Sequence, residues 1–349
     1  MPKPSIAFFD AKPYDMDFFN RANREAAFGI TYFQSHLSRE NAVLCRGHDA
    51  VCIFVNDTLD QAVADILAEA GIQLVALRSA GYNNVDLKAV YRRIHVVRVP
   101  AYSPHAVAEH AVALMLTLNR KTHKAYFRTR DNNFNINGLM GFDMFGKTAG
   151  IIGTGRIGAL TAGILRGFGM RVLAYDAHPK ENVARESGVA YVDLDTLYRE
   201  SDIISLHCPL TPETTHLVNA GSIRKMKAGV MIINTGRGKL ISTVDLIAGL
   251  KRGKIGAAGL DVYEEETEYF FEDFSSSIVN DDVLARLLTF PNVLITSHQG
   301  FFTAEALLAI ASTTLENIRL YFEEGRCPNE ICYRCSEKEC LRDTRGRCF

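Results

Sequence analysis

Short apolar runs recur along the chain, and segments with helical spacing separate them. Near the beginning, these runs predict strands at 4–9, 50–55, 72–77 and 96–99, with a loop through 12–14. Between two of the strands, Val63, Ile66 and Leu67 have the spacing of one helix face, and Gly71 ends that helix. Because parallel strands are usually joined by helices, this part of the chain predicts a small α/β domain.

The same alternation begins again near residue 148. Apolar runs predict strands at 148–152, 171–175, 202–206, 230–234, 256–260 and 292–296, and helices near 157–168, 194–200, 219–227 and 243–252. The acidic and aromatic segment 263–282 interrupts the alternation. The pattern predicts a second, mostly parallel and doubly wound sheet.

Two long helical segments lie beside this second sheet in the sequence. Ser103 and Pro104 suit the first positions of a helix, and 106–118 is apolar nearly all round, which predicts burial on several sides. Its continuation, 119–130, is basic and is expected at the surface. Segment 303–322 is amphipathic, and we expect it to return to the N-terminal domain. The predicted domains are therefore 1–101 with 299–349, and 102–298.

Composition places the chain among ordinary globular proteins. It has 349 residues, 47% hydrophobic and 23% charged, and a formal net charge of −1. The near-zero charge gives no reason to expect nucleic acid or an anionic membrane as a partner. Apolar runs are too short for a membrane span or a secretory signal, so a cytoplasmic location is expected.

Five of the eight cysteines lie in the last part of the chain: Cys327, Cys332, Cys335, Cys340 and Cys348. Cys332 and Cys335 form one C-x-x-C pair, but a structural zinc site usually has a second such pair or histidines. The sequence contains no histidine after His298. We therefore expect a polar, arginine-rich tail with exposed thiols and no metal site.

A glycine-rich motif follows the strand predicted at 148–152. Gly153, Gly155 and Gly158 have the G-x-G-x-x-G spacing, which permits a tight turn, approach of a diphosphate to the backbone, and close packing of the next helix. The following strand ends at Asp176, 18 residues after Gly158, where a carboxylate can bind a ribose hydroxyl. The motif predicts a dinucleotide site that prefers NAD.

Polar residues follow the other predicted strands of this sheet, where ligands of open α/β sheets bind. Arg237 can hold a carboxylate bidentately and polarise a carbonyl. His298 can give and take a proton near neutrality, and a neighbouring carboxylate would orient its ring. Spacing leaves the choice of carboxylate open among Glu264, Glu265 and Glu266. These residue types suit hydride transfer to a 2-keto acid, whereas His110 and His207 are expected to be structural.

Along nearly its whole length the chain resembles the D-isomer-specific 2-hydroxyacid dehydrogenases, and most of all their fermentative bacterial D-lactate dehydrogenase branch. The stretches that carry the resemblance are 51–57, 76–86, 97–109, 150–158, 204–212, 234–238, 259–266 and 298–306. The resemblance implies a flavodoxin-like substrate domain, a Rossmann-type NAD domain, and a homodimer or homotetramer in which 104–118 forms the dimer contact.

The resemblance also implies site residues. The catalytic set falls on Arg237, Glu266 and His298. The substrate is expected at Ala80, Gly81 and Tyr102, together with Arg237 and His298. Besides the motif glycines, the NAD contacts fall on Arg156, Ile157, Asp176, Cys208, Pro209, Thr235, Gly236 and Asp261. Gly300, where close relatives tend to have alanine, is expected to loosen the backbone beside His298, and the cysteine tail lies outside the shared pattern.

The leading hypothesis is an NAD-dependent D-lactate dehydrogenase that reduces pyruvate. One alternative is an enzyme for a bulkier 2-keto acid, and another is a non-enzymatic NADH-sensing protein on the same scaffold. An L-lactate or malate dehydrogenase is disfavoured, because its glycine motif would lie near the N-terminus and not at Gly153.

Overall fold

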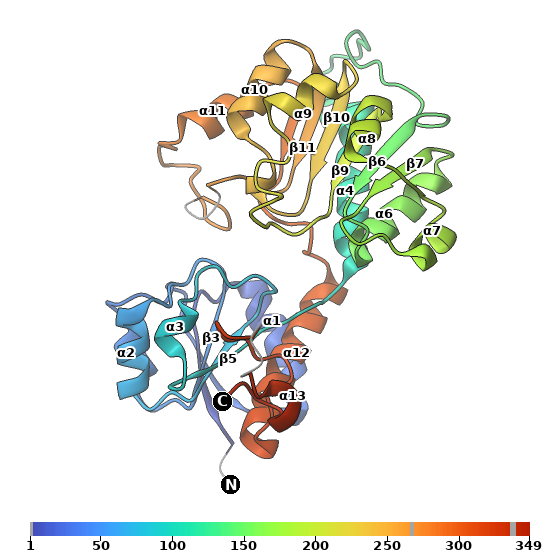
Figure 1. Ribbon diagram of the computed structural model, residues 1–349. Helices are drawn as coiled ribbons and strands as arrows, with labels where there is room; N and C mark the ends of the chain where they lie inside the picture. Colours follow the sequence, from blue (N-terminus) through green and yellow to red (C-terminus); the bar gives the residue numbers. More distant parts are fainter. Residues whose placement is uncertain (1–2, 266–268, 336–339) are drawn as a thin grey trace. The chain divides into compact units, whose positions relative to one another are not determined.

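A computed structural model describes residues 3–265, 269–335 and 340–349 (Figure 1). The chain divides into two compact units, 1–103 with 302–349 and 104–301. Within the described residues, every helix is too short or too polar to cross a membrane.

Unit 1 is built on a five-stranded parallel sheet in the order β2-β1-β3-β4-β5. The strands are β1 (Ser5–Phe8), β2 (Gly29–Tyr32), β3 (Ala50–Ile53), β4 (Leu74–Leu77) and β5 (His95–Val97). The helices are α1 (Pro13–Ala26), η1 (Ala42–Cys45), α2 (Gln61–Glu69), α3 (Leu87–Val90), α12 (Ala304–Glu324) and α13 (Arg342–Arg345). The predicted α/β domain is confirmed.

Alternate residues of the unit 1 strands enter two separate cores. Ala7, Val51 and Val75 face α2 and α3, while Phe8, Cys52 and Ala76 face α1 and α12. Figure 1 shows α1 and α12 together on the second face. Because both faces are covered, β1, β3 and β4 are continuous apolar runs, which is why they could be predicted from the sequence, whereas the partly exposed edge strand β2 was not predicted.

Two local expectations in the chain were wrong. The predicted loop through 12–14 contains the start of α1, where Pro13 takes the first helical position and the Asp15 carboxylate accepts the Lys12 amide at 3.2 Å. The helix from Pro104 does not continue through 119–130. Lys121 adopts a left-handed backbone with φ of 50°, which separates α4 (Pro104–Arg120) from α5 (Thr122–Arg130).

Unit 2 contains a seven-stranded parallel sheet in the order β12-β11-β10-β9-β6-β7-β8. The strands are β6 (Thr148–Ile152), β7 (Arg171–Tyr175), β8 (Ala190–Tyr191), β9 (Ile203–Leu206), β10 (Val230–Asn234), β11 (Ile255–Leu260) and β12 (Val293–Ile295). The remaining helices are α6 (Arg156–Gly167), α7 (Glu181–Ser187), α8 (Leu194–Glu200), α9 (Ala220–Lys225), η2 (Gly238–Leu240), α10 (Thr243–Lys251) and α11 (Asp282–Leu288).

Helices cover both faces of the unit 2 sheet, so the predicted doubly wound architecture is confirmed. One face packs against α4 and α6, and α4 is buried along most of its length, as its apolar sequence predicted. The other face packs against α8, α9, α10 and α11. The strand order changes direction between β6 and β9, which creates a crevice at their carboxyl ends.

Candidate active site

The glycine motif occupies the turn between β6 and α6, at this change of direction. Gly153 has φ of +92°, and a Cβ there would lie 2.5 Å from the Cys208 amide nitrogen. A Cβ on Gly158 would lie 2.0 Å from the Gly153 carbonyl oxygen. By contrast, a Cβ on Gly155 would meet nothing within 4 Å. Gly153 and Gly158 therefore permit close packing, while Gly155 leaves open space at the amino end of α6 for a diphosphate.

Asp176 follows β7 and lies beside this turn. One of its carboxylate oxygens accepts hydrogen bonds from the Thr154 amide at 2.6 Å and the Thr154 hydroxyl at 2.9 Å, and the other accepts the His178 amide at 2.9 Å. Partial burial raises the pKa of Asp176, but these hydrogen bonds outweigh it, so the net pKa lies below the ordinary value. The carboxylate is charged and still has lone pairs for ribose hydroxyl groups.

The turn after β10 carries a buried hydroxyl group that suits ligand binding. The Thr235 hydroxyl is buried and has no hydrogen-bond partner among the described residues. The Asn234 side chain shapes this turn, because it accepts the Gly236 amide at 3.1 Å and donates to the Arg237 carbonyl at 2.9 Å. Together with the space at Gly155, the unpaired Thr235 hydroxyl fits a polar dinucleotide bound over the carboxyl ends of the strands.

The remaining predicted cofactor contacts surround the same turns. Arg156 is exposed at the start of α6, and Ile157 is half-buried behind it. Cys208 follows β9, and burial raises the pKa of its thiol to about 11, so it is a neutral, apolar contact. Pro209 beside it is exposed. These positions are compatible with the predicted contacts, which stay predictions.

Arg237 follows the end of β10, and His298 follows the end of β12, with β11 between these two strands. The Asp261 amide donates to the Asn234 carbonyl at 2.9 Å, and the Asp261 carbonyl accepts the His298 amide at 2.8 Å, so the ends of β10, β11 and β12 are linked. Both Arg237 and His298 are half-buried. A Cβ on Gly238 would lie 1.9 Å from the Tyr263 carbonyl, which shows how closely the Arg237 turn packs on the segment after β11.

Asp261 organises the segment that carries His298. Its carboxylate accepts hydrogen bonds from the Thr296 hydroxyl at 2.5 Å, the Gln299 amide at 2.9 Å and the Gly300 amide at 2.7 Å. The His110 ring lies 3.2 Å from the same carboxylate and 3.0 Å from the Thr296 hydroxyl. We call these five residues the Asp261 network. It gives Asp261 a positioning role in addition to the predicted cofactor contact.

The Asp261 network holds the backbone at His298 and at Gly300. His298 has φ of 49°, an uncommon backbone for a non-glycine residue, and hydrogen bonds on both sides keep it there. The predicted loosening at Gly300 is wrong, since Gly300 is buried and its amide is bound to Asp261. His110 has the structural role that the sequence suggested.

Asp261→Asn should lower the free energy of unfolding by about 1–3 kcal/mol, because a side-chain amide has one oxygen and cannot accept all the hydrogen bonds that the Asp261 carboxylate receives in the network. Burial raises the pKa of Asp261, but hydrogen bonds from His110, Thr296 and Gly300 bring it below the ordinary 3.8. The stabilisation is therefore complete above pH 3.8 and is lost as pH falls through the folded-state pKa. Urea unfolding at neutral and acidic pH measures this, and the difference from the parent should narrow in acid. Asp282→Asn, at an exposed position of α11, is the control; equal losses in both variants would contradict the role of the network.

Of the three glutamates after β11, the structure describes Glu264 and Glu265, which differ in their surroundings. The Glu264 carboxylate is occupied, because it contacts the His216 ring at 2.7 Å and accepts the Thr243 amide at the start of α10 at 2.7 Å. Glu265 is exposed. Glu266 lies outside the described residues, so its assignment as the carboxylate partner of His298 stays a prediction. The contacts of Glu264 argue against that residue as the partner.

The predicted substrate contacts of unit 1 lie in the turn after β4. The Arg98 guanidinium donates to the Ala80 carbonyl at 2.7 Å, and the Ser79 hydroxyl donates to the Gly81 carbonyl at 2.7 Å. The turn is therefore shaped before any ligand arrives, and Arg98, which the sequence did not single out, is part of it. Tyr102, the other predicted contact in unit 1, is half-buried.

A buried arginine supports this turn from below. The Arg78 guanidinium lies 4.5 Å from the centre of the Phe8 ring and 4.8 Å from that of Phe54. It donates to the Asp10 carbonyl at 2.6 Å and lies 3.5 Å from the Asp15 carboxylate. A cation enclosed in this way is held by aromatic and acidic neighbours, which fixes the backbone that leads into Ala80 and Gly81.

Comparison with known proteins identifies the family. Residues 112–300 match the NAD binding domain of the D-isomer specific 2-hydroxyacid dehydrogenases. The chain belongs to this family. It is 51% identical to D-lactate dehydrogenase of Escherichia coli over 93% of this chain and 99% of the relative. The apo-structure of D-lactate dehydrogenase from E. coli superposes with a TM-score of 0.87, 50% identity, and coverage of 94% and 99% of the two chains. A structure of D-2-hydroxyisocaproate dehydrogenase has a TM-score of 0.83 and 28% identity, with coverage of 94% and 99%.

Membership of the D-isomer specific 2-hydroxyacid dehydrogenases makes the chain an NAD-dependent oxidoreductase. The matched region lies within unit 2 and contains the glycine turn, Asp176, Thr235 and the Asp261 network except His110. NAD is therefore the cofactor of this chain. When bound, the nicotinamide supplies the hydride of the reaction.

Proposed function

We propose that this protein is a D-lactate dehydrogenase that reduces pyruvate with NADH to D-lactate and catalyses the reverse reaction. The observation that carries the proposal is the placement of Arg237 and His298 at linked strand ends of an NAD-binding unit, in a chain 51% identical to the E. coli enzyme.

In the proposed reduction, Arg237 binds the carboxylate of the 2-keto acid with its planar guanidinium and polarises the neighbouring carbonyl. A hydride is added to the carbonyl carbon, and His298 donates a proton to the carbonyl oxygen, which gives the alcohol and NAD⁺. Glu266 is assigned to orient and charge the His298 ring. The backbone of Ala80 and Gly81, with Tyr102, is assigned to the substrate. Asp261 holds the backbone of His298 in place.

A steady-state comparison of 2-keto acids tests the proposal. We expect pyruvate to have the highest kcat/KM with NADH, and chiral chromatography of the product to show D-lactate. A preference for a branched or aromatic keto acid would instead assign the bulkier substrate class. Absence of turnover with every keto acid, together with tight NADH binding, would support the NADH-sensing alternative.

We propose that the enzyme works in the cytoplasm as a homodimer or homotetramer, with α4 in the dimer contact. Most apolar residues of α4 are buried within unit 2, but Ala113 is exposed and Leu116 is partly exposed, and this remaining apolar surface supports the proposed dimer contact. Sedimentation equilibrium of the purified protein measures the assembly. A monomer at micromolar concentration would contradict the proposed assembly.

NADH should be preferred over NADPH by at least about tenfold in kcat/KM, equal to about 1.4 kcal/mol of differential binding. The charged Asp176 carboxylate can accept ribose hydroxyl groups but repels a 2′-phosphate. The adjacent residues, Ala177 and His178, supply no arginine to bind that phosphate. Titrating both cofactors at saturating pyruvate measures the ratio. Asp176→Ala should bring the two values closer, and equal values in the parent would contradict the role of Asp176.

A further inference from the structure

The C-terminal tail is attached to the edge of the unit 1 sheet. The Ile331 amide donates to the Val96 carbonyl at 2.9 Å, next to an antiparallel bridge between Val97 and Glu330. At the end of the chain, the Phe349 ring stacks on His95 at 4.3 Å between ring centres. The described part of the tail therefore pairs with β5 at the edge of the sheet, and this pairing places its cysteines.

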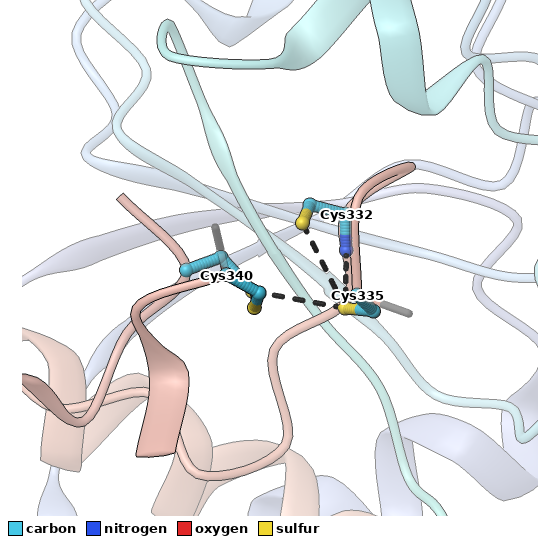
Figure 2. Close-up of side chains that lie close together, drawn as sticks. Cys332, Cys335 and Cys340 are labelled. Carbon is cyan, nitrogen blue, oxygen red and sulfur yellow. Dashed lines mark hydrogen bonds between the residues drawn. The ribbon is translucent and has the colours of Figure 1, made fainter. Parts of the chain in front are cut away.

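The cysteine side chains of this tail gather at one point. The sulfur atoms of Cys332, Cys335, Cys340 and Cys348 all lie within 4.8 Å of one another. Figure 2 shows three of them, Cys332, Cys335 and Cys340, with their sulfur atoms turned toward one another. Cys332 and Cys348 are buried and the other two are partly buried. The expectation of exposed thiols is therefore wrong.

The separations between these sulfur atoms distinguish two kinds of site. Cys335 Sγ lies 3.7 Å from Cys332 Sγ and 3.8 Å from Cys348 Sγ, and Cys340 Sγ lies 3.6 Å from Cys348 Sγ. A disulfide bond requires about 2.05 Å between sulfur atoms. Four sulfur atoms placed tetrahedrally at 2.3 Å around a zinc ion are about 3.8 Å apart. These three distances match edges of that tetrahedron, and the other three pairs of sulfur atoms lie within 4.8 Å.

Neighbouring groups support the four sulfur atoms without adding ligands. The Cys332 amide donates to Cys335 Sγ at 3.1 Å, which fixes the position of this sulfur atom. The buried Glu330 carboxylate contacts the His95 ring at 2.5 Å with one oxygen and accepts the Cys348 amide with the other. Glu330 is thus already used to place the backbone of Cys348, and the four thiols remain as the ligand set.

The charge of the tail suits such a site. A divalent ion bound by four thiolates has a net charge of −2, which needs positive charge nearby. The tail sequence 329–349 has five basic residues, Arg334, Lys338, Arg342, Arg345 and Arg347, and four acidic ones, Glu330, Glu337, Glu339 and Asp343, so its own net charge is +1. Arg342 also donates to the Glu330 carbonyl at 3.1 Å, so at least one of these arginines is attached to the segment that holds the cluster.

We propose that Cys332, Cys335, Cys340 and Cys348 bind one zinc ion, which closes the C-terminal tail on unit 1. The ligand spacing is C-x₂-C-x₄-C-x₇-C. This pattern lacks the second C-x-x-C pair that a structural zinc site usually has. Cys340 and Cys348 are too far apart in sequence for a short turn, and the fold of the tail brings them together. Four thiolates of this geometry are typical of a structural zinc site, with no open position for catalysis.

Metal analysis of the full-length protein, purified without chelators, tests the proposal. The parent should contain one zinc ion per chain by elemental mass spectrometry, and native mass spectrometry should give the mass of the chain plus zinc. Cys335→Ser and Cys340→Ser should each lose most of the zinc. Cys45→Ala, which removes a buried free thiol of η1 in the same unit, should keep it.

Replacement of the ion by cobalt(II) gives a second readout that does not depend on the variants. The parent should show thiolate-to-cobalt charge transfer and the visible absorption of tetrahedral cobalt. A metal-free parent with reactive thiols, two disulfide bonds, or iron in place of zinc would each overturn the proposal. Pyruvate reduction is assayed separately, so the zinc proposal and the proposed activity fail independently of each other.

Discussion

Arg237→Lys should lower kcat/KM for pyruvate by about 10²- to 10³-fold, equal to about 3–4 kcal/mol of lost transition-state stabilisation. Lysine keeps the positive charge but loses the planar pair of donors that can bind a carboxylate and polarise a carbonyl together. We expect KM to rise and kcat to fall, since the proposed contacts exist before and during the reaction. The measurement is a pyruvate titration at saturating NADH, with NADH binding followed by fluorescence.

Arg224→Lys is a matched control, because Arg224 is an exposed arginine on α9 of the same unit and should leave both constants unchanged. The turn at Arg237 should survive the substitution. Its shape depends on the Asn234 side chain and on Gly238, and a lysine ammonium can replace the guanidinium as the donor to the Gly236 carbonyl, a bond that measures 2.7 Å in the parent. Kinetic constants of Arg237→Lys equal to those of the parent would mean that another group binds the substrate carboxylate.

His298→Gln should lower kcat by about 10²- to 10⁴-fold, the range that a general acid contributes. Glutamine can still donate a hydrogen bond but cannot transfer a proton to the developing alkoxide. NADH affinity should change little, because the glycine turn and Asp176 belong to other strand ends. Stopped-flow measurement of a single turnover separates this chemical step from product release.

The control for this variant is His123→Gln, a half-buried histidine on α5 of the same unit. Its kcat should equal that of the parent. The unfolding free energy of His298→Gln needs to be measured as well, because residue 298 has the uncommon φ of 49°. If adding a stabiliser such as glycerol restored the kcat of His298→Gln, the loss would come from a structural defect. That outcome would argue against proton donation by His298.

The sequence alone determined most of the sheet architecture. Strands covered on both faces need apolar residues at every position, so β3, β4, β6, β9 and β10 were visible as continuous apolar runs. The glycine turn was equally local, since its spacing is required by contacts within a few residues and by the strand beside it. Arg237 could be singled out because it follows β10, and His298 because it follows the apolar run at 292–296.

Elements with weaker local signals were missed. Pro13 and Asp15 mark the start of α1, but the preceding strand and proline suggested a loop. The break between α4 and α5 falls at Lys121, where no glycine or proline in the sequence predicts the end of a helix. For α1, helix packing supplies what the local signal lacks, because α1 is stabilised by its contact with α12, which lies almost the whole chain away in sequence.

Only the tertiary structure showed how distant residues combine at the two sites. The Asp261 network joins His110, Asp261 and Gly300 from separate segments, and Glu264 is removed from the candidate partners by contacts with His216 and Thr243. Cys348 joins Cys332 only because Glu330 and His95 hold the tail on β5. Periodicity describes a residue's own strand or helix, whereas these contacts depend on how separate elements pack together.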